Sequence, residues 1–487
     1  MARRPPFPGP VHGLALLALL GASTLLAQPA GTIQDEALVA PYTLPDPLRF
    51  QDGRPVRDAT DWREGRRPEV LRLLEEQVYG RAPAGPATLR SEVVETDSKA
   101  LGGRATRRQV RVLLDDRGGG FDLLLYVPNG AARPVPTFLV PNFGGNHTVH
   151  PDPAIRLSTS WVRDRTGGGN HRATEASRGI AAGSFPVERI LDRGYALATF
   201  TYADFEPDHR EGLRDGVRAR FGPGPDALGP SDWGAIAAWA WGLSRALDFL
   251  ETDRDVDARR VAVLGHSRLG KTALWAGARD ERFAMVVSND SGEGGAALAR
   301  RRFGETVKAI TGAFPHWFAP RFREYAGREE ALPVDAHLLL ALVAPRPLYV
   351  ASATEDLWAD PRGEFLAAKA AEPVYRLLGR DGLGVDEWPA PDHPVGGTIG
   401  YHLRRGPHAL TAYDWEQVLA FADRHLRPAA AGGLAPPATS RASPARCSST
   451  GPTRRSSRWS GVDVDLDGDQ LLHRPPVGAA RRAGFRP

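Results

Sequence analysis

Residues 261–271, VAVLGHSRLGK, decide the fold. Residues 261–264 form a continuous apolar, largely β-branched run, which is typical of a parallel strand buried on both faces. A Gly-x-Ser step follows directly, and apolar residues return at helical spacing from Thr272 onward. Strand, tight turn and helix together have the layout of a nucleophile elbow, which presents Ser267 at the top of a sheet.

The glycines beside the serine support this interpretation. A Cβ atom at Gly265 or Gly270 would clash with the neighbouring strand and helix of an elbow. A Gly-x-Ser step alone carries little weight in a chain with 53 glycines. The alternative is an ordinary strand-to-helix turn, but the buried strand before it and the apolar helix after it favour the elbow.

The two ends of the chain differ in composition from the rest. Arg3 and Arg4 precede a short apolar run that ends in small residues, so residues 1–30 predict a secretory signal peptide. The run is too short for a spanning helix. Residues 429–487 are rich in Ala, Gly, Pro, Ser and Arg without apolar periodicity, which predicts a disordered tail. We therefore expect a secreted or periplasmic protein whose catalytic domain is residues 31–428, with no membrane attachment after signal removal.

Charge and cysteine content narrow the possible partners. The net charge of +4 arises at the chain ends, because nine arginines and four aspartates follow position 429 and the signal adds two arginines. The slightly acidic body argues against nucleic acid as a partner. Cys447, the single cysteine, can form neither an intrachain disulfide nor a cysteine metal site. Residues 463–468 resemble the start of a calcium loop but have Arg474 where the bidentate glutamate belongs. No metal or other cofactor is expected.

Strand and helix patterns alternate along the body of the chain. Strands are predicted at 106–113, 121–127, 136–140, 195–202, 261–264, 283–288 and 347–353, and helices after 61–62, after 231–232 and at 413–426. Ser231 and Asp232 are the expected cap of the second helix, and Thr411 and Asp414 form the expected capping box of the last. The alternation predicts an α/β class protein with an α/β-hydrolase fold, in which a mostly parallel central sheet lies in a three-layer α/β/α sandwich.

Two loops are expected to lie near the serine. Residues 150–186 are polar and glycine-rich and too long for a simple connection, so we interpret them as an insertion near the active site. The strand at 136–140 leads into PNFGGNH at 141–147. A Gly-Gly loop after an early strand is where this fold keeps an oxyanion-hole amide, although Gly144 and Gly145 are equally consistent with a plain turn.

A catalytic serine needs an imidazole base, and in this fold the histidine comes last along the chain. The base is expected on a loop just before the final helix, where His408 stands in RGPHALT at 405–411. His393 and His402 are alternatives because they fall in the same predicted loop.

The carboxylate that orients the histidine should follow a strand. Asp356 follows the strand at 347–353 and is our first choice, with Glu355 expected to be a solvated neighbour. Asp290 follows the strand at 283–288 and could reach the same imidazole, although capping a helix is an equally good explanation of its position.

Four segments together resemble the glucuronoyl esterases, carbohydrate esterase family 15, and its bacterial branch in particular. They are GHSRLGK (265–271), NDSGEGGAALARRRFGETV (289–307), EDLWADPRGEF (355–365) and GPHALTAYDW (406–415). The resemblance spans about residues 46–426. It implies a carboxylic ester hydrolase of the 4-O-methyl-glucuronoyl methylesterase type. Such an enzyme cleaves the ester between (4-O-methyl) glucuronic acid of glucuronoxylan and lignin alcohols through a serine acyl-enzyme, without a metal.

The resemblance also implies roles for the residues of the catalytic centre. Ser267 would be the nucleophile and His408 the base, while Arg268 and its backbone N–H would donate to the oxyanion. The family places its acid after either of two strands, and this chain has a carboxylate at both places. The resemblance therefore leaves open whether Asp290 or Asp356 orients the histidine.

Three further residues resemble the family's substrate contacts. Lys271 and Glu305 would bind sugar hydroxyls and Trp358 the uronate, whereas without the resemblance a surface ion pair and core packing would explain them. Two other functions share many of these features. One is a different carbohydrate esterase, such as an acetyl-xylan esterase, and the other is a non-catalytic carbohydrate-binding protein on the same fold. A monomer is expected in each case.

Overall fold

The computed structural model describes residues 32–427 except 87–88, 117–118, 165–169 and 225–226. The predicted signal peptide and the predicted tail therefore lie outside the described residues. None of the helices in the described part combines the length and apolarity that crossing a membrane requires.

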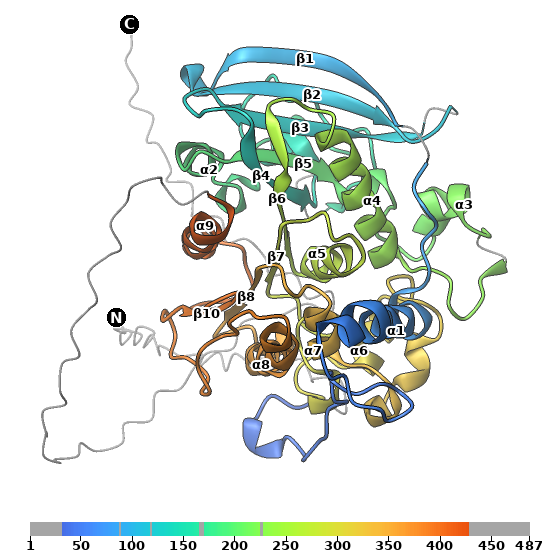
Figure 1. The fold of residues 1–487 in the computed structure, drawn as a ribbon. Helices are drawn as coiled ribbons and strands as arrows, with labels where there is room; N and C mark the ends of the chain where they lie inside the picture. The colour runs from blue at the N-terminus through green and yellow to red at the C-terminus, as the bar shows by residue number, and fades with distance from the viewer. Residues whose placement is uncertain (1–31, 87–88, 117–118, 165–169, 225–226, 428–487) are drawn as a thin grey trace, which may run out of the picture.

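A ten-stranded sheet forms the centre of the molecule, in the order β1-β2-β3-β5-β4-β6-β7-β8-β10-β9 (Figure 1). The strands are β1 (Arg90–Ala100), β2 (Ala105–Leu113), β3 (Gly120–Pro128), β4 (Val135–Asn142), β5 (Ala196–Thr201), β6 (Val256–His266), β7 (Met285–Asn289), β8 (Leu348–Ala353), β9 (Val395–Gly396) and β10 (Ile399–Arg404). Neighbouring strands from β5 to β10 pair in parallel, whereas β1, β2, β3 and β5 pair antiparallel, as do β9 and β10.

Helices cover both faces of the sheet. They are α1 (Arg67–Leu74), α2 (Val187–Asp192), α3 (Val217–Phe221), α4 (Ala235–Leu250), α5 (Arg268–Arg279), α6 (Val307–Ala313), α7 (Ala336–Ala341), α8 (Pro361–Leu377) and α9 (Ala412–Leu426). In Figure 1, α2 and α9 lie on one face of the sheet, and α4, α5 and α7 lie on the other. The predicted three-layer α/β/α arrangement is therefore confirmed.

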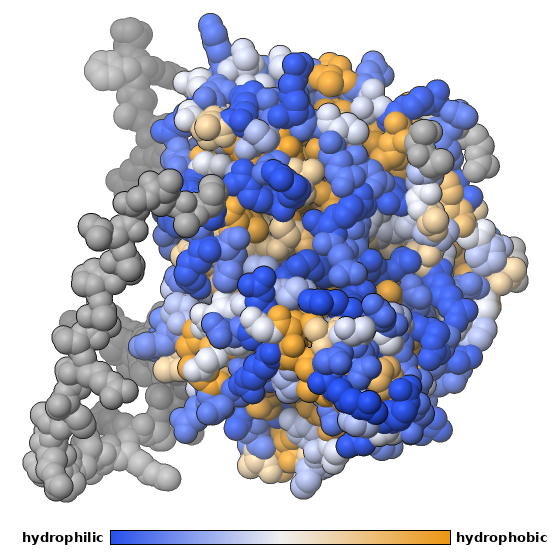
Figure 2. Space-filling view, viewed as in Figure 1, coloured by the Kyte–Doolittle hydropathy of each residue, from blue (hydrophilic) through white to orange (hydrophobic). Residues whose placement is uncertain are grey.

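The alternation of side chains along β6 explains why both faces need cover. Val261 and Val263 pack into the core beneath α4 and α5, whereas Ala262 and Leu264 pack into the core beneath α2 and α9. Successive strand side chains point to opposite faces, so an apolar run without polar interruptions must be buried twice. Polar side chains cover most of the molecular face drawn in Figure 2, with apolar patches between them.

The structure differs from the sequence-based expectation at several places. The helix predicted to begin at Ser231 and Asp232 begins at Ala235 with Gly234 as its cap, and neither expected residue caps it. The strands predicted at 106–113 and 121–127 are present, and they form an antiparallel edge to the mostly parallel sheet. The segment expected to be a loop around His402 contains β10, whose six residues are all buried.

Candidate active site

Ser267 stands at a strained turn between β6 and α5, as the elbow interpretation predicts. Its backbone has φ 58° and ψ −129°, a conformation that residues with a side chain rarely adopt. Its N–H donates to the carbonyl of Asn289 at 2.9 Å, which ties the turn to the end of β7. A Cβ at Gly265 would lie 1.8 Å from the carbonyl oxygen of Leu269, and one at Gly270 would lie 2.9 Å from Cβ of Ser291. The glycines are therefore required by close approach.

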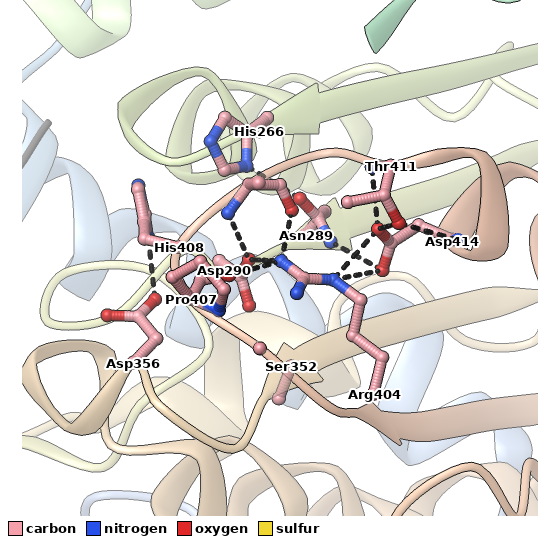
Figure 3. Close-up of polar contacts among 12 residues, drawn as sticks. His266, Asn289, Asp290, Ser352, Asp356, Arg404, Pro407, His408, Thr411 and Asp414 are labelled. Atoms are coloured by element: carbon pink, nitrogen blue, oxygen red, sulfur yellow. Dashed lines mark hydrogen bonds and ion pairs between the residues drawn. The ribbon is translucent and has the colours of Figure 1, made fainter. Parts of the chain in front are cut away.

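His408 lies in the loop between β10 and α9, and a carboxylate orients its ring. Its Nδ1 is 2.6 Å from Oδ2 of Asp356, which follows β8 (Figure 3). The other oxygen of Asp356 accepts from the N–H of Ala359 at 3.3 Å. Because the ionised carboxylate can only accept, Nδ1 carries the proton and Nε2 is the basic nitrogen of the neutral ring. This is the arrangement of a histidine that acts as a general base.

Asp290 lies close to the same histidine but has different partners. One ligand atom from each of Asp290, Asp356 and His408 falls within 4.8 Å of the others. Oδ2 of Asp290 accepts from Nη2 of Arg404 at 3.2 Å and from the N–H of Ala409 at 3.3 Å, and no helix is capped by it. Burial, and next the charge of Asp356, raise the pKa of Asp290 well above its ordinary value. Asp290 therefore holds the loop that carries His408.

The two alternative histidines have structural partners. His402 is fully buried on β10, where Nε2 lies 2.9 Å from Asp414 and Nδ1 lies 2.9 Å from the hydroxyl of Tyr349. His393 is exposed, and its Nδ1 lies 2.9 Å from the carbonyl oxygen of Pro391. Of the three candidate histidines, His408 is the one whose ring contacts Asp356, the carboxylate that follows β8.

Arg404, the last residue of β10, links the residue after β7 to the start of α9 (Figure 3). Its guanidinium binds Asp290 and, at 2.9 Å, Oδ2 of Asp414. Asp414 forms the predicted capping box with Thr411 at the start of α9, and it also accepts from Nδ2 of Asn289 at 3.3 Å. Sequence reasoning found the capping box but not Arg404, because nothing in the sequence pattern showed that position 404 ends a strand.

Arg268 is buried at the start of α5 with its guanidinium above aromatic rings. Its Cζ atom lies 4.8 Å from the ring centroid of Trp317, 5.6 Å from that of Phe314 and 5.8 Å from that of Phe143. Nη1 donates to the carboxylate of Asp208. The faces of aromatic rings attract a cation placed over them, so these rings help to hold the guanidinium in place. Asp208 was not identified from the sequence.

The Gly-Gly loop after β4 is organised by Asn142. The N–H of Gly145 donates to Oδ1 of Asn142 at 2.8 Å, so this amide is used inside the loop. The turn interpretation therefore suits Gly145 better than the oxyanion-hole interpretation. The loop instead contributes Phe143, whose ring faces the guanidinium of Arg268.

Lys271 lies one helical turn after Ser267 on α5 and pairs with Glu305, which in turn contacts Trp358. Nζ of Lys271 donates to the carbonyl of Ser291 and lies 3.7 Å from Oε2 of Glu305. The N–H of Glu305 donates to the carbonyl of Trp358 at 2.8 Å. Both charged side chains are buried, which lowers the pKa of Lys271 and raises that of Glu305. A buried pair excludes the surface ion pair considered from the sequence.

Glu364 braces the loop after β7 from α8. Its Oε1 accepts from the N–H groups of Ser291 and Gly292 at 2.8 and 3.0 Å, and its Oε2 accepts from the hydroxyl of Ser352. Full burial raises the pKa of Glu364 to about 7. Helical spacing marks Glu364 as part of α8 but could not show that its carboxylate points inward.

Comparisons with known proteins agree with this geometry. A family model for fungal glucuronyl esterases matches residues 183–379. A carbohydrate esterase from an unknown prokaryotic organism is 50% identical over 408 residues, covering 82% of this chain and 93% of that protein. A 4-O-methyl-glucuronoyl methylesterase from Schizophyllum commune is 30% identical over 380 residues, covering 75% of this chain and 81% of its own length.

Solved structures give the same result for the fold. A glucuronoyl esterase from Solibacter usitatus has a TM-score of 0.77 and 50% identity, covering 80% of this chain and 100% of that one. A glucuronoyl esterase from Teredinibacter turnerae has a TM-score of 0.67 and 35% identity, covering 78% and 89% of the two chains. The α/β-hydrolase fold expected from the sequence is confirmed.

Proposed function

Since the chain belongs to the glucuronoyl esterases of carbohydrate esterase family 15, we propose that it acts through an acyl-enzyme on Ser267, with His408 as base and Asp356 as its orienting acid. The chain is a carboxylic ester hydrolase that cleaves esters between glucuronic acid and lignin alcohols. The observation that carries the mechanism is the 2.6 Å contact between Nδ1 of His408 and Asp356. The ring of His408 also lies 4.5 Å from that of His266, the residue before Ser267, and Ser267 is held at φ 58°.

In the acylation step, the hydroxyl oxygen of Ser267 attacks the ester carbonyl of the uronate. Nε2 of His408 takes the hydroxyl proton and then gives it to the departing alcohol oxygen, so the C–O bond to the alcohol breaks as the serine ester forms. In the second step, a water molecule attacks the serine ester. His408 takes a proton from this water and returns one to the serine oxygen, which releases glucuronate.

Arg268 provides the positive charge for the tetrahedral oxyanion. The negative charge exists only in the transition state and the intermediate, so donors fixed in advance stabilise these states more than the bound ester. The buried guanidinium, held over Trp317, is such a fixed donor. Removing one oxyanion donor typically lowers kcat by about 10²–10³-fold.

The sugar side of the substrate is assigned to Lys271, Glu305 and Trp358. An ammonium donates to hydroxyls and a carboxylate accepts from them, so the pair can bind two neighbouring sugar hydroxyls. The indole offers an apolar face for the uronate ring. With these contacts, the proposed substrate is a 4-O-methyl-glucuronoyl ester on glucuronoxylan. The proposed active form of the enzyme is a monomer.

The location follows the predicted organisation of the chain. We assign residues 1–30 to a signal peptide, 31–428 to the catalytic domain with its insertion at 150–186, and 429–487 to a tail outside it. Secretion or periplasmic export is then expected, and N-terminal sequencing of the mature protein from the medium or periplasm tests the cleavage.

Hydrolysis of benzyl glucuronate tests the mechanism. Ser267→Ala and His408→Ala should each lower kcat by at least about 10³-fold. His393→Ala is the matched control, because this exposed histidine comes from the same part of the chain and should retain wild-type turnover. Undiminished turnover in Ser267→Ala would contradict the acyl-enzyme. Turnover of an acetyl ester alone would indicate a different carbohydrate esterase, and no turnover of either ester would indicate a binding protein.

A further inference from the structure

Asp208, in the loop after β5, is a fully buried carboxylate on which five donors converge. They are Nη1 of Arg268, Nη2 of Arg163 at 2.8 Å and the hydroxyl of Tyr202 at 3.1 Å on Oδ2, with Nε2 of His316 at 2.9 Å and Nε1 of Trp317 at 2.7 Å on Oδ1. A carboxylate has about four lone-pair positions, so these donors saturate it.

The donors require Asp208 to be ionised. If Asp208 were protonated, its acid hydrogen would point at a group that is itself a hydrogen-bond donor. The two arginines and the hydrogen bond from His316 lower the pKa of Asp208 well below its ordinary value, against the effect of burial. His316 donates through Nε2–H for the same reason.

Asp208 fixes Arg268 in two ways. It binds one end of the guanidinium directly, and it also binds the indole N–H of Trp317, over which the guanidinium lies 4.8 Å from the ring centroid. The charge and the surface beneath it are therefore held by one carboxylate. Arginine side chains have many rotamers, so a fixed partner is needed if the charge is to be in place before the reaction.

Oδ2 of Asp208, which binds Arg268, also accepts from Arg163 in the segment 150–186. Trp161 in this segment stacks on His171 with ring centroids 5.2 Å apart, and its ring lies 5.3 Å from that of His209, next to Asp208. The segment is thus attached to the carboxylate that holds the catalytic arginine.

We infer that Asp208 is a positioning residue of the esterase, which fixes the guanidinium of Arg268 for the oxyanion and ties the 150–186 segment to it. The inference rests on the proposed function of Arg268. Asp208 acts through Arg268 and Trp317 and does not itself need to touch substrate.

A double-mutant cycle tests the inference. Asp208→Asn replaces an acceptor oxygen with an amide that opposes the donors, and kcat for benzyl glucuronate should fall about 10²-fold with a smaller change in KM. In Arg268→Gln, kcat should fall by a similar factor. If Asp208 acts through Arg268, the double variant should fall little further than Arg268→Gln alone. If the loss of kcat in the double variant equals the product of the two single losses, the inference is overturned.

Glu206→Gln is the control for loss of a buried ion pair in the same loop. Glu206 is also fully buried, and both of its carboxylate oxygens accept from the guanidinium of Arg218. Its substitution should lower Tm while kcat of the folded enzyme stays near wild type. An equal loss of kcat in Glu206→Gln and Asp208→Asn would show a merely structural effect and overturn the inference.

Tyr202→Phe provides a milder cycle if Asp208→Asn fails to fold. It removes one donor to Asp208 and keeps the ring, so kcat should fall about fivefold in the wild-type background and remain unchanged in Arg268→Gln. An equal fall in both backgrounds would overturn the inference.

Ser267→Ala, assayed in parallel, separates the two proposals. If it stays active, the proposed function fails. If it is inactive while Asp208→Asn keeps wild-type kcat, only the positioning role fails.

Discussion

Nδ1 of His408 lies 2.6 Å from Oδ2 of Asp356. The carboxylate at the end of the neighbouring strand, Asp290, binds Arg404 and the N–H of Ala409 instead. Two carboxylates thus lie within reach of one imidazole, but they have different hydrogen-bond partners. Asp356 contacts the ring of His408, and Asp290 holds the loop that carries this ring.

Asp356→Asn and Asp290→Asn should therefore differ in activity. Loss of the carboxylate on Nδ1 removes the group that fixes the tautomer and stabilises the imidazolium, so kcat should fall by about 10³–10⁴-fold in Asp356→Asn. Asp290→Asn keeps that group and should lose less than about tenfold in kcat. Initial rates on benzyl glucuronate, with Tm measured for both variants, make the comparison. A larger loss in Asp290→Asn would reverse the assignment.

Lys271→Met should separate sugar recognition from ester chemistry. The variant keeps the buried methylene stem but loses the donor that pairs with Glu305, so kcat/KM for a glucuronate ester should fall at least about tenfold. Any slow hydrolysis of an acetyl ester, which has no sugar acid to bind, should be unchanged. If both substrates lose activity equally, Lys271 supports the catalytic centre rather than the substrate.

Glu364 should make the stability of the protein depend on pH. Its pKa is raised to about 7 in the folded state from an ordinary value of 4.5, so the folded protein binds the proton more tightly than the unfolded chain. Folding stability contributed by this group is therefore complete below about pH 4.5 and is lost as the pH rises through 7.

Glu364→Gln imitates the protonated acid, because its amide can donate to Ser352 as the acid hydroxyl would. Between pH 5 and pH 8 the wild type should lose about 2 kcal/mol of stability relative to Glu364→Gln. Urea unfolding at several pH values measures the difference. A constant difference across this range would show that Glu364 does not titrate there.

Gly265→Ala and Gly312→Ala test the packing of the elbow. The added methyl group at position 265 would lie 1.8 Å from the carbonyl oxygen of Leu269, so this variant should lose at least about 3 kcal/mol or fail to fold. At position 312, near the end of α6, a Cβ meets nothing within 4 Å. Gly312→Ala should be neutral or stabilising by up to about 1 kcal/mol. Equal stabilities would contradict the close approach at the elbow.

The sequence predicted well those elements that have a local signal. The strand that leads into Ser267 is a continuous apolar run, and the last helix has an apolar stripe and a capping box. The edge strand Arg90–Ala100 was missed because most of its side chains are exposed and polar. β10 was missed because its charged and aromatic residues are buried only through distant partners, such as Asp414 for His402.

The same distinction applies to the site. Ser267 and His408 could be located from a turn motif and from the position of the final helix. Asp208 could not be located, since its five donors come from segments between positions 163 and 317 that only the folded chain brings together. The choice between Asp290 and Asp356 likewise depended on side-chain direction, which spacing along a strand does not give.

The backbone of Ser267 sets activity against stability at a single position. A side chain at φ 58° and ψ −129° costs on the order of 1–3 kcal/mol, and glycine there would relieve the cost. Ser267→Gly should accordingly unfold at a higher temperature than Ser267→Ala, although neither can form the acyl-enzyme. A laboratory selection for heat resistance alone would drift toward glycine at this position, so activity must be selected in every round if the enzyme is to be made more robust.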